Sequence, residues 1–243
     1  MKTAVNNYRT DPLTDRYDLV KTRHSDDMLK LLSDYLPASA RVLEIGPGHG
    51  HFAQAARDAG LDYEGIEPSD FFREQLLANG FSVSDDVVPP IASQDSAYDL
   101  VYGSMFIENL PTSREAGDFA FEAFRVMKPN GVIALIFPNY LTWGAFFFDE
   151  HYTHSFVTTA KRVEHLLASQ GFKIERTNHV LGWYWVEENL WRNIVRHAAN
   201  ITMWAVHSAL ARWVFTSLGL KEFHWKLRKT LFEAIIMIAQ KPA

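Results

Sequence analysis

The chain has 243 residues, a formal net charge of −5 and no cysteine. The lack of cysteine excludes disulfides, a thiolate zinc site and a cysteine nucleophile. The acidic balance argues against non-specific binding of nucleic acid, so no nucleic-acid partner is expected. The first residues contain no apolar signal segment, and we therefore expect a cytoplasmic protein.

The first predicted element is a helix, or two helices, over residues 12–36. Met28, Leu31, Leu32 and Leu36 share one of its faces, and Pro37 ends it. Strand and helix patterns then alternate along the chain. This alternation predicts an α/β fold with a doubly wound, mostly parallel sheet that binds its ligand at the carboxyl ends of the strands. The alternating elements are expected at 41–46, 51–60, 62–67, 69–78, 81–84, 98–103, 115–127 and 132–138.

A glycine-rich turn follows the first predicted strand. Gly46, Gly48 and Gly50 leave no Cβ atom in the way, so a ligand can approach the backbone closely. The next strand ends in Glu67, whose carboxylate can accept the hydroxyl protons of a ribose. This pair of features predicts a nucleoside site, and by itself it would suit either an adenosine-containing methyl donor or a dinucleotide.

Four segments in chain order resemble motifs of the class I S-adenosylmethionine-dependent methyltransferases: residues 42–50, 65–69, 98–110 and 122–138. The resemblance implies a seven-stranded Rossmann-like sheet whose final strand runs antiparallel. It also implies S-adenosyl-L-methionine as methyl donor and S-adenosyl-L-homocysteine as product. The resemblance further suggests the residues that bind this cofactor. They are Glu44, Gly46, Gly48 and Gly50 in and before the turn, Glu67 and Pro68 at the ribose, Asp85 or Asp86 at the adenine, and Ser104 and Met105 at the methionine portion.

Acceptor residues are predicted in the loop from Asp149 to His154, after the fifth strand. His154 matches a histidine often found there in the family, whereas the usual aspartate three residues earlier is His151 here. If the acceptor is a hydroxyl, a histidine near neutral pKa is a natural base, so His154 is the first candidate and His151 the second. An isolated loop histidine serves equally well as a hydrogen-bonding scaffold. No metal site is expected, because this mixture of carboxylate and imidazole suits Mg²⁺ or Mn²⁺ poorly.

The rest of the chain contains a predicted helix at 159–170, a strand at 172–180 and a final strand at 234–240. About fifty residues separate these two strands, far more than a hairpin needs, so 187–229 is interpreted as a helical insertion. We therefore expect one methyltransferase domain over 1–243. Its parts are an N-terminal helical cap at 1–38, a cofactor-binding core at 39–180, a helical lid at 181–230, and the last strand and tail at 231–243.

The predicted lid has a surface of its own. Residues 181–243 carry a net charge of +4, against −9 for residues 1–180, and they hold six of the seven tryptophans. Polar residues (Arg192, Arg196, Asn200, His207) fall on one stripe, opposite apolar ones (Leu190, Ile194, Ile201, Trp204, Val214). A packed lid or a homodimer face is the leading interpretation, and peripheral contact with a membrane or a lipid-linked substrate is the second. A membrane span is disfavoured by the scattered polar residues.

Three functions are compatible with these patterns. The leading one is methylation of a small-molecule or glycan acceptor, most plausibly at a hydroxyl of a sugar, with a quinone-like, natural-product or lipid-linked acceptor as the alternative. An NAD-dependent oxidoreductase is less favoured because the segments 98–110 and 128–131 argue against it. A non-catalytic S-adenosylmethionine-binding protein is the third hypothesis.

Overall fold

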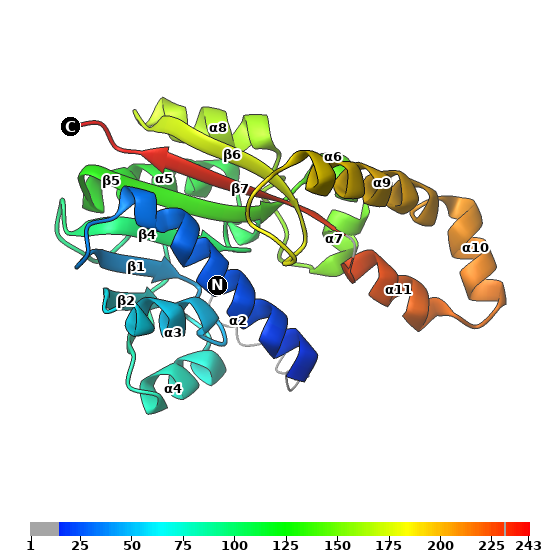
Figure 1. The fold of residues 1–243 in the computed structure, drawn as a ribbon, viewed down its shortest axis with the longest axis horizontal. Coiled ribbons are helices and arrows are strands. Elements are labelled where there is room, and N and C mark those ends of the chain that lie inside the picture. Colours follow the sequence, from blue (N-terminus) through cyan, green and yellow to red (C-terminus); the bar gives the residue numbers. More distant parts are fainter. Residues whose placement is uncertain (1–14, 231) are drawn as a thin grey trace.

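Seven strands form one sheet in the order β3-β2-β1-β4-β5-β7-β6 (Figure 1). The computed structural model describes residues 15–230 and 232–243, so the predictions for residues 1–14 lie outside the described part. Strands β1 to β5 pair in parallel, whereas β7 runs antiparallel to both of its neighbours. The predicted mostly parallel sheet with an antiparallel last strand is thereby confirmed. The strands are β1 (Arg41–Ile45), β2 (Asp62–Ile66), β3 (Ser82–Ser84), β4 (Tyr98–Ser104), β5 (Met127–Pro138), β6 (Lys173–Leu181) and β7 (Glu233–Gln240).

Both faces of the sheet are buried, and successive residues of the central strands belong to different hydrophobic cores. In β7, for example, Ile235 and Met237 pack into one core and Ile236 and Ile238 into the other. Helices α5 (Ser113–Val126) and α8 (Ala160–Ser169) cover the first face. Helices α2 (Asp15–Leu32), α3 (His51–Asp58) and α4 (Asp70–Ala78) cover the second (Figure 1). This double burial explains why the strands read as continuous apolar runs.

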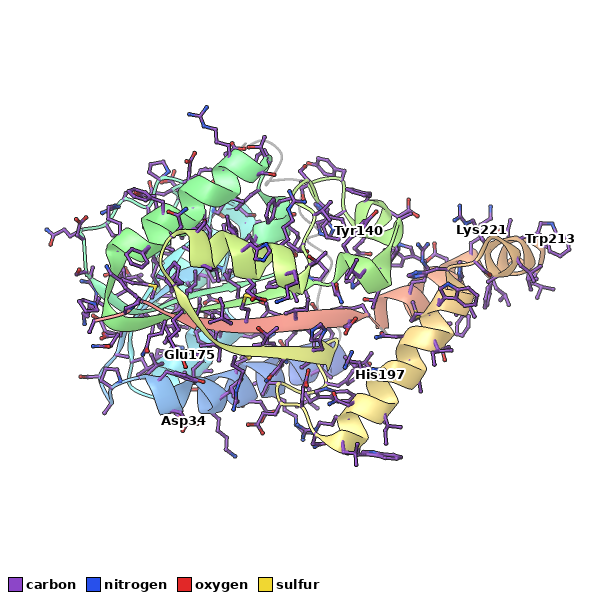
Figure 2. The ribbon with its side chains drawn as sticks, turned by 90° about the horizontal axis from the view of Figure 1, so that it is seen from above. Asp34, Tyr140, Glu175, His197, Trp213 and Lys221 are labelled. Carbon is purple, nitrogen blue, oxygen red and sulfur yellow. The ribbon has the colours of Figure 1, made fainter. Side chains whose placement is uncertain are left out.

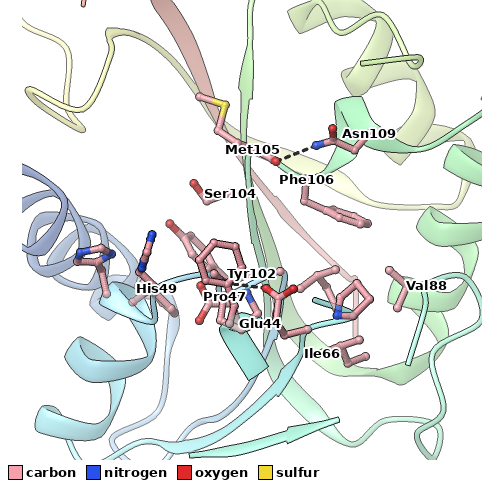
Figure 3. A pocket seen from close by; sticks show the side chains of 18 of the residues that line it. Glu44, Pro47, His49, Ile66, Val88, Tyr102, Ser104, Met105, Phe106 and Asn109 are labelled. Atoms are coloured by element: carbon pink, nitrogen blue, oxygen red, sulfur yellow. Dashed lines mark hydrogen bonds between the residues drawn. The ribbon is translucent and has the colours of Figure 1, made fainter. Parts of the chain in front are cut away.

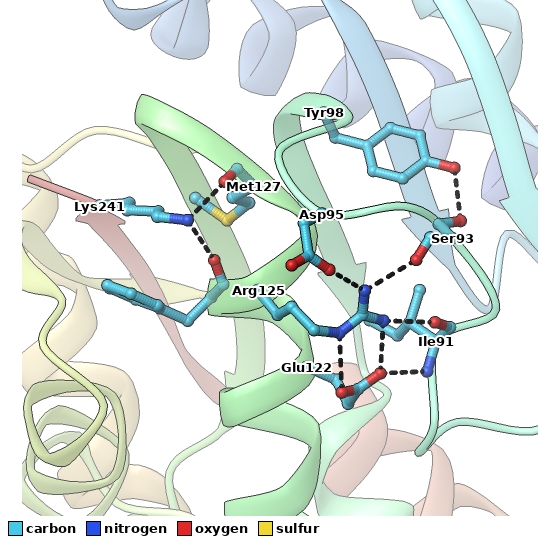
Figure 4. A network of polar contacts seen from close by, with 9 residues as sticks. Ile91, Ser93, Asp95, Tyr98, Glu122, Arg125, Met127 and Lys241 are labelled. Atoms are coloured by element: carbon cyan, nitrogen blue, oxygen red, sulfur yellow. Dashed lines mark hydrogen bonds and ion pairs between the residues drawn. The ribbon is translucent and has the colours of Figure 1, made fainter. Parts of the chain in front are cut away.

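The connection between β3 and β4 is fixed to α5 through Arg125. Its guanidinium donates to the carbonyl oxygens of Ile91 and Ser93, both at 2.8 Å, and to the carboxylates of Asp95 and Glu122 (Figure 4). These contacts satisfy backbone carbonyls in a segment that has no regular structure of its own. They hold the entry to β4, and β4 in turn leads to the cavity described below.

The predicted insertion between β6 and β7 is helical. It contains α9 (Leu190–Val206), α10 (Ala209–Ser217) and α11 (Lys221–Thr230), which we call the arm. The arm extends beyond the end of the sheet, and α10 lies farthest from it (Figure 1). Within residues 15–230 and 232–243, no helix combines the length and apolar character that a membrane span requires. The short helix η1 (Ser33–Tyr35) falls within the helical segment predicted at 12–36. Short helices absent from the prediction are η2 (Ile107–Asn109), α6 (Tyr140–Trp143) and α7 (Phe146–Glu150).

Candidate functional site

A cavity of about 360 Å³ lies at the carboxyl ends of β1, β2 and β4, where a doubly wound sheet is expected to bind its ligand (Figure 3). Its walls come from α2, the glycine turn, the ends of these strands and the loops that follow β3 and β4. Of the cofactor residues predicted from the sequence, all but Gly50 and Asp85 line it. Those that do are Glu44, Gly46, Gly48, Glu67, Pro68, Asp86, Ser104 and Met105.

The glycine turn presents bare backbone to the cavity. Gly46 and Gly48 have φ angles of 72° and 56°, and a Cβ atom added to either would meet nothing within 4 Å. A side chain at these positions would therefore be strained and would project into open space. Gly50 has a different role, because a Cβ there would lie 2.6 Å from Cδ2 of Leu76. The third glycine thus allows the start of α3 to pack against α4, and its predicted cofactor contact stays a prediction.

Glu67 joins the end of β2 to this turn. Its Oε2 accepts a hydrogen bond from the backbone N–H of Gly48 and its Oε1 accepts one from Ser69, both at 2.9 Å. Burial raises the pKa of Glu67, although these backbone hydrogen bonds and the charge of Arg73 oppose the rise. Each carboxylate oxygen has a further lone pair, so the group can hold the turn and still accept ligand hydroxyls.

Glu44 and Lys21 place an acidic and a basic group in the cavity wall. Glu44 accepts a hydrogen bond from the hydroxyl of Tyr63 at 2.7 Å, and burial raises its pKa to about 8 despite the opposing charge of Lys21. The stem of Lys21 is partly exposed, but its ammonium group lies deep, and burial lowers its pKa to about 7. The Nζ atom is 3.0 Å from the ring centroid of Trp183, which follows β6.

Helix α2 supplies cavity residues that the sequence reasoning missed. Tyr17, Lys21, His24 and Ser25 line the cavity. They occupy positions i, i+4, i+7 and i+8, which continue the buried stripe of Met28 toward the start of the helix. The signal that could have identified them is that polar side chains continue the helical spacing of the apolar stripe into the first turns of α2. His24 is 3% exposed, and burial lowers its pKa to about 3, so its imidazole is neutral at physiological pH.

The structure distinguishes the two aspartates proposed for the adenine. Asp86 lines the cavity beside Val87 and Val88, and its Oδ2 accepts a hydrogen bond from the Ser84 hydroxyl at 2.9 Å. Asp85 is exposed and does not line the cavity. The placement therefore favours Asp86.

A chain of hydrogen bonds connects the cavity to the histidine loop. Asn109 and Thr153 both line the cavity. Asn109 lies close to Met105 (Figure 3). The Asn109 amide Nδ2 donates to the Met105 carbonyl at 3.1 Å, which directs Oδ1 toward Thr153, and the Thr153 hydroxyl donates to it. His151 Nδ1 lies 2.6 Å from the same hydroxyl oxygen. The backbone N–H of Thr153 lies 3.4 Å from the same nitrogen, so Nδ1 ties His151 to both the hydroxyl and the backbone of Thr153.

His154 has a different environment. Its Nδ1 donates to the Phe147 carbonyl at 2.6 Å, and its ring packs 4.8 Å from the Phe147 ring, centroid to centroid. Burial lowers its pKa to about 4. Neither His154 nor His151 lines the cavity. The contacts of His154 are those of a scaffold residue, and its role as a base stays a prediction. Among the described residues, no three histidine or carboxylate side chains are grouped so that they could hold a metal ion.

Comparison with known proteins agrees with this geometry. The sequence profile of a family described as "Methyltransferase domain" matches residues 13–177. An uncharacterized methyltransferase of Mycobacterium leprae (strain Br4923) is 32% identical over 115 residues, which are 44% of this chain and 39% of that protein. The chain therefore matches about two fifths of the length of that relative.

Solved structures with the same fold include two methyltransferases. A SAM-dependent methyltransferase from Archaeoglobus fulgidus has a TM-score of 0.58 at 20% identity, covering 92% of this chain and 94% of that one. Phosphoethanolamine N-methyltransferase 2 of Haemonchus contortus, solved with S-adenosyl-L-methionine, has a TM-score of 0.63 at 16% identity, covering 100% and 60%. At these identities the likeness is one of fold.

Proposed function

Because this chain belongs to the class I S-adenosylmethionine-dependent methyltransferases, we propose that it methylates a hydroxyl group of a small-molecule or glycan acceptor, with a loop histidine as base. S-adenosylmethionine, when bound, supplies a methyl group on a positively charged sulfur, which is a good leaving group. The protein must then mainly exclude water, hold an in-line acceptor and receive its proton.

The residues of the cavity fit this cofactor. Its methionine end carries one ammonium and one carboxylate group, and the wall offers the complementary pair Glu44 and Lys21. The bare backbone at Gly46 and Gly48 leaves room for it, and Glu67 faces the ribose. We assign Lys21 to the carboxylate because its ammonium group is the deeply placed cation of this wall.

The observation that carries the acceptor proposal is the chain from Asn109 through Thr153 to His151. It brings the loop to the cavity wall beside Ser104 and Met105, where the methyl group is expected. We place His151 ahead of His154 as the base, because its hydrogen-bond partner Thr153 lines the cavity, whereas His154 is bonded to the Phe147 carbonyl. The acceptor's proton would then move to the imidazole of His151.

The test compares the two histidines. The wild type is screened for methyl transfer to glycans, phenols and quinones, and S-adenosylhomocysteine affinity is measured by calorimetry, with NAD as the competing ligand. His151→Ala should abolish turnover while leaving that affinity unchanged, and His154→Ala should lower thermal stability but retain turnover. Normal turnover by His151→Ala would remove this histidine from the mechanism. Affinity for NAD in place of S-adenosylhomocysteine would overturn the proposed function.

A further inference from the structure

The arm is an amphipathic structure whose apolar face points outward. In α9, Leu190, Ile194, Ile201 and Trp204 are spaced so that they share one helical face, and each is between 51% and 81% exposed. A surface helix of a globular protein normally turns such a stripe toward the core. Here the stripe faces solvent, so the usual account of an amphipathic helix does not apply.

The opposite face of α9 points toward the protein and combines the buried Ala199 and Met203 with polar side chains. Arg196 is 11% exposed at its side chain and donates to Oε1 of the buried Glu233 at 2.6 Å. Arg192 donates to the backbone carbonyl of Glu187 at 3.1 Å. Because these contacts fix the rotation of the helix, the apolar stripe cannot turn inward without breaking a buried ion pair.

The other two helices of the arm add to the exposed apolar surface. Leu210, Trp213 and Leu218 lie on or next to α10 and Phe223 on α11, and each is more than half exposed. Figure 2 shows the arm from above, with Trp213 and Lys221 at its outer end. Neither of the two described cavities is lined by arm residues, so these side chains lie on the outer surface and not in either cavity. Large apolar side chains that are exposed in this way suit insertion into the headgroup region of a bilayer.

Charge indicates what covers this surface. The last 63 residues carry an excess of four positive charges, whereas the first 180 carry an excess of nine negative ones. Exposed Arg212 and Lys221 stand beside the exposed tryptophans of the arm. Tryptophan with lysine and arginine is the composition that binds the headgroup region of an anionic bilayer. A second copy would instead bring the same positive excess against itself.

We propose that the arm docks this protein on the surface of an anionic lipid bilayer, with its apolar side chains entering the headgroup region. Contact is peripheral, since none of the described helices could cross the bilayer. The arm begins after β6 and ends at β7, at the same end of the sheet as the cavity, where the parallel strands finish. A docked arm therefore brings that end of the sheet to the membrane, which suits a lipid-linked acceptor. Only this last step rests on the proposed function.

The experiment is flotation of the full chain with vesicles, without any methyl acceptor, so that its result is separate from activity. Vesicles of about three parts phosphatidylcholine to one part phosphatidylglycerol are compared with phosphatidylcholine alone, at about 0.1 M and about 0.5 M salt. We expect about tenfold stronger binding to the anionic vesicles at low salt, with a loss at high salt. The combined substitution Trp204→Gln and Trp213→Gln should weaken binding by about tenfold without changing the melting temperature.

The matched control is Phe121→Gln, since Phe121 is an exposed aromatic residue on α5, outside the arm. It should bind vesicles as the wild type does. The single substitution Trp213→Gln gives a second readout if the double variant folds poorly. Binding that the tryptophan variants leave unchanged, or a wild type that ignores both vesicle types, overturns the proposal. Dimers in light scattering that the same substitutions dissociate, without vesicle binding, assign the surface to a second copy and also overturn it.

Discussion

Arg196 in α9 and Glu233 at the first position of β7 form a buried ion pair, with 2.6 Å between Nη1 and Oε1. The same carboxylate accepts hydrogen bonds from His179 in β6 and from the Asn139 amide after β5. Three strands and the arm therefore meet at one buried charge. The pair fixes both where the arm attaches and which of its faces is exposed.

Removing the cation should destabilise the whole domain. In Arg196→Met the Glu233 carboxylate stays buried with one charged partner fewer, and we expect a loss of about 3 kcal/mol in the free energy of unfolding. The control is Arg192→Met, on the same face of α9 but bonded only to a backbone carbonyl, which should cost about 0.5 kcal/mol. Urea denaturation measures both, and equal losses would contradict the role given to the ion pair.

The same variant should change the response to acid. Burial acts to raise the pKa of Glu233, but hydrogen bonds from His179 and Asn139 and the charges of His179 and Arg196 outweigh it and lower the pKa. A lowered carboxyl pKa contributes stability above the unfolded value, and that contribution is lost as pH falls through the folded pKa. Without Arg196 the depression shrinks. Melting curves from pH 7 to pH 3 should therefore converge for wild type and Arg196→Met, and a constant gap would refute this linkage.

Gly48→Ala should separate ligand binding from backbone strain. Its φ of 56° makes any side chain cost about 1 kcal/mol, and the new methyl group enters the cavity. Gly60→Ala is the matched control, because Gly60 has a φ of 73° and open space around it but does not line the cavity. Both variants should lose similar stability. Calorimetry should show a loss of at least about tenfold in S-adenosylhomocysteine affinity for Gly48→Ala alone; a matching loss for Gly60→Ala would show that strain is the cause.

Lys21→Met tests the proposed contact with the cofactor's carboxylate. A charge-assisted hydrogen bond is removed, so affinity for S-adenosylhomocysteine should fall by about tenfold or more, while adenosine, which lacks the carboxylate, should bind as before. Lys30→Met, an exposed position on the same helix, should affect neither ligand. An equal loss for both ligands in Lys21→Met would point to collapse of the cavity wall.

His154 should make the protein sensitive to acid. Burial lowers its pKa from 6.5 to about 4, so the unfolded chain binds more protons between these values. The titration of His154 therefore leaves the free energy of unfolding unchanged above pH 6.5 and lowers it as pH drops toward 4. His154→Phe keeps an aromatic ring against Phe147 but cannot titrate, so its melting temperature should fall less over this range. The exposed His165→Gln should behave like the wild type.

Much of the fold could be predicted because its signals are local. The apolar run from Val42 to Ile45 and the glycines after it specify a buried strand and a turn within ten residues. The site depends on contacts between distant segments. Nothing near Lys21 in the sequence indicates that its ammonium group meets Trp183, because that pairing requires the segment after β6 to pack against α2.

The arm gives the clearest case of what periodicity leaves open. The polar and apolar stripes of α9 were predicted, but a stripe pattern does not say which stripe faces the protein. The inward face is fixed by the ion pair between Arg196 and the buried carboxylate of Glu233, which lies 37 residues farther along the chain. The sequence pattern left a packed lid, a dimer face and a membrane-contact surface as alternatives, and the structure turns the apolar stripe outward.

The place of β7 has a consequence for how this architecture can diversify. Strand β7 lies between β5 and β6 and begins at the same end of the sheet at which β6 finishes. A segment inserted between β6 and β7 therefore leaves and re-enters the sheet at that end and disturbs no hydrogen bond between strands. The helices inserted there can be lengthened, shortened or exchanged while the nucleoside-binding half keeps its geometry. This junction is therefore the position at which a change of inserted segment could direct the same catalytic fold to a different place in the cell.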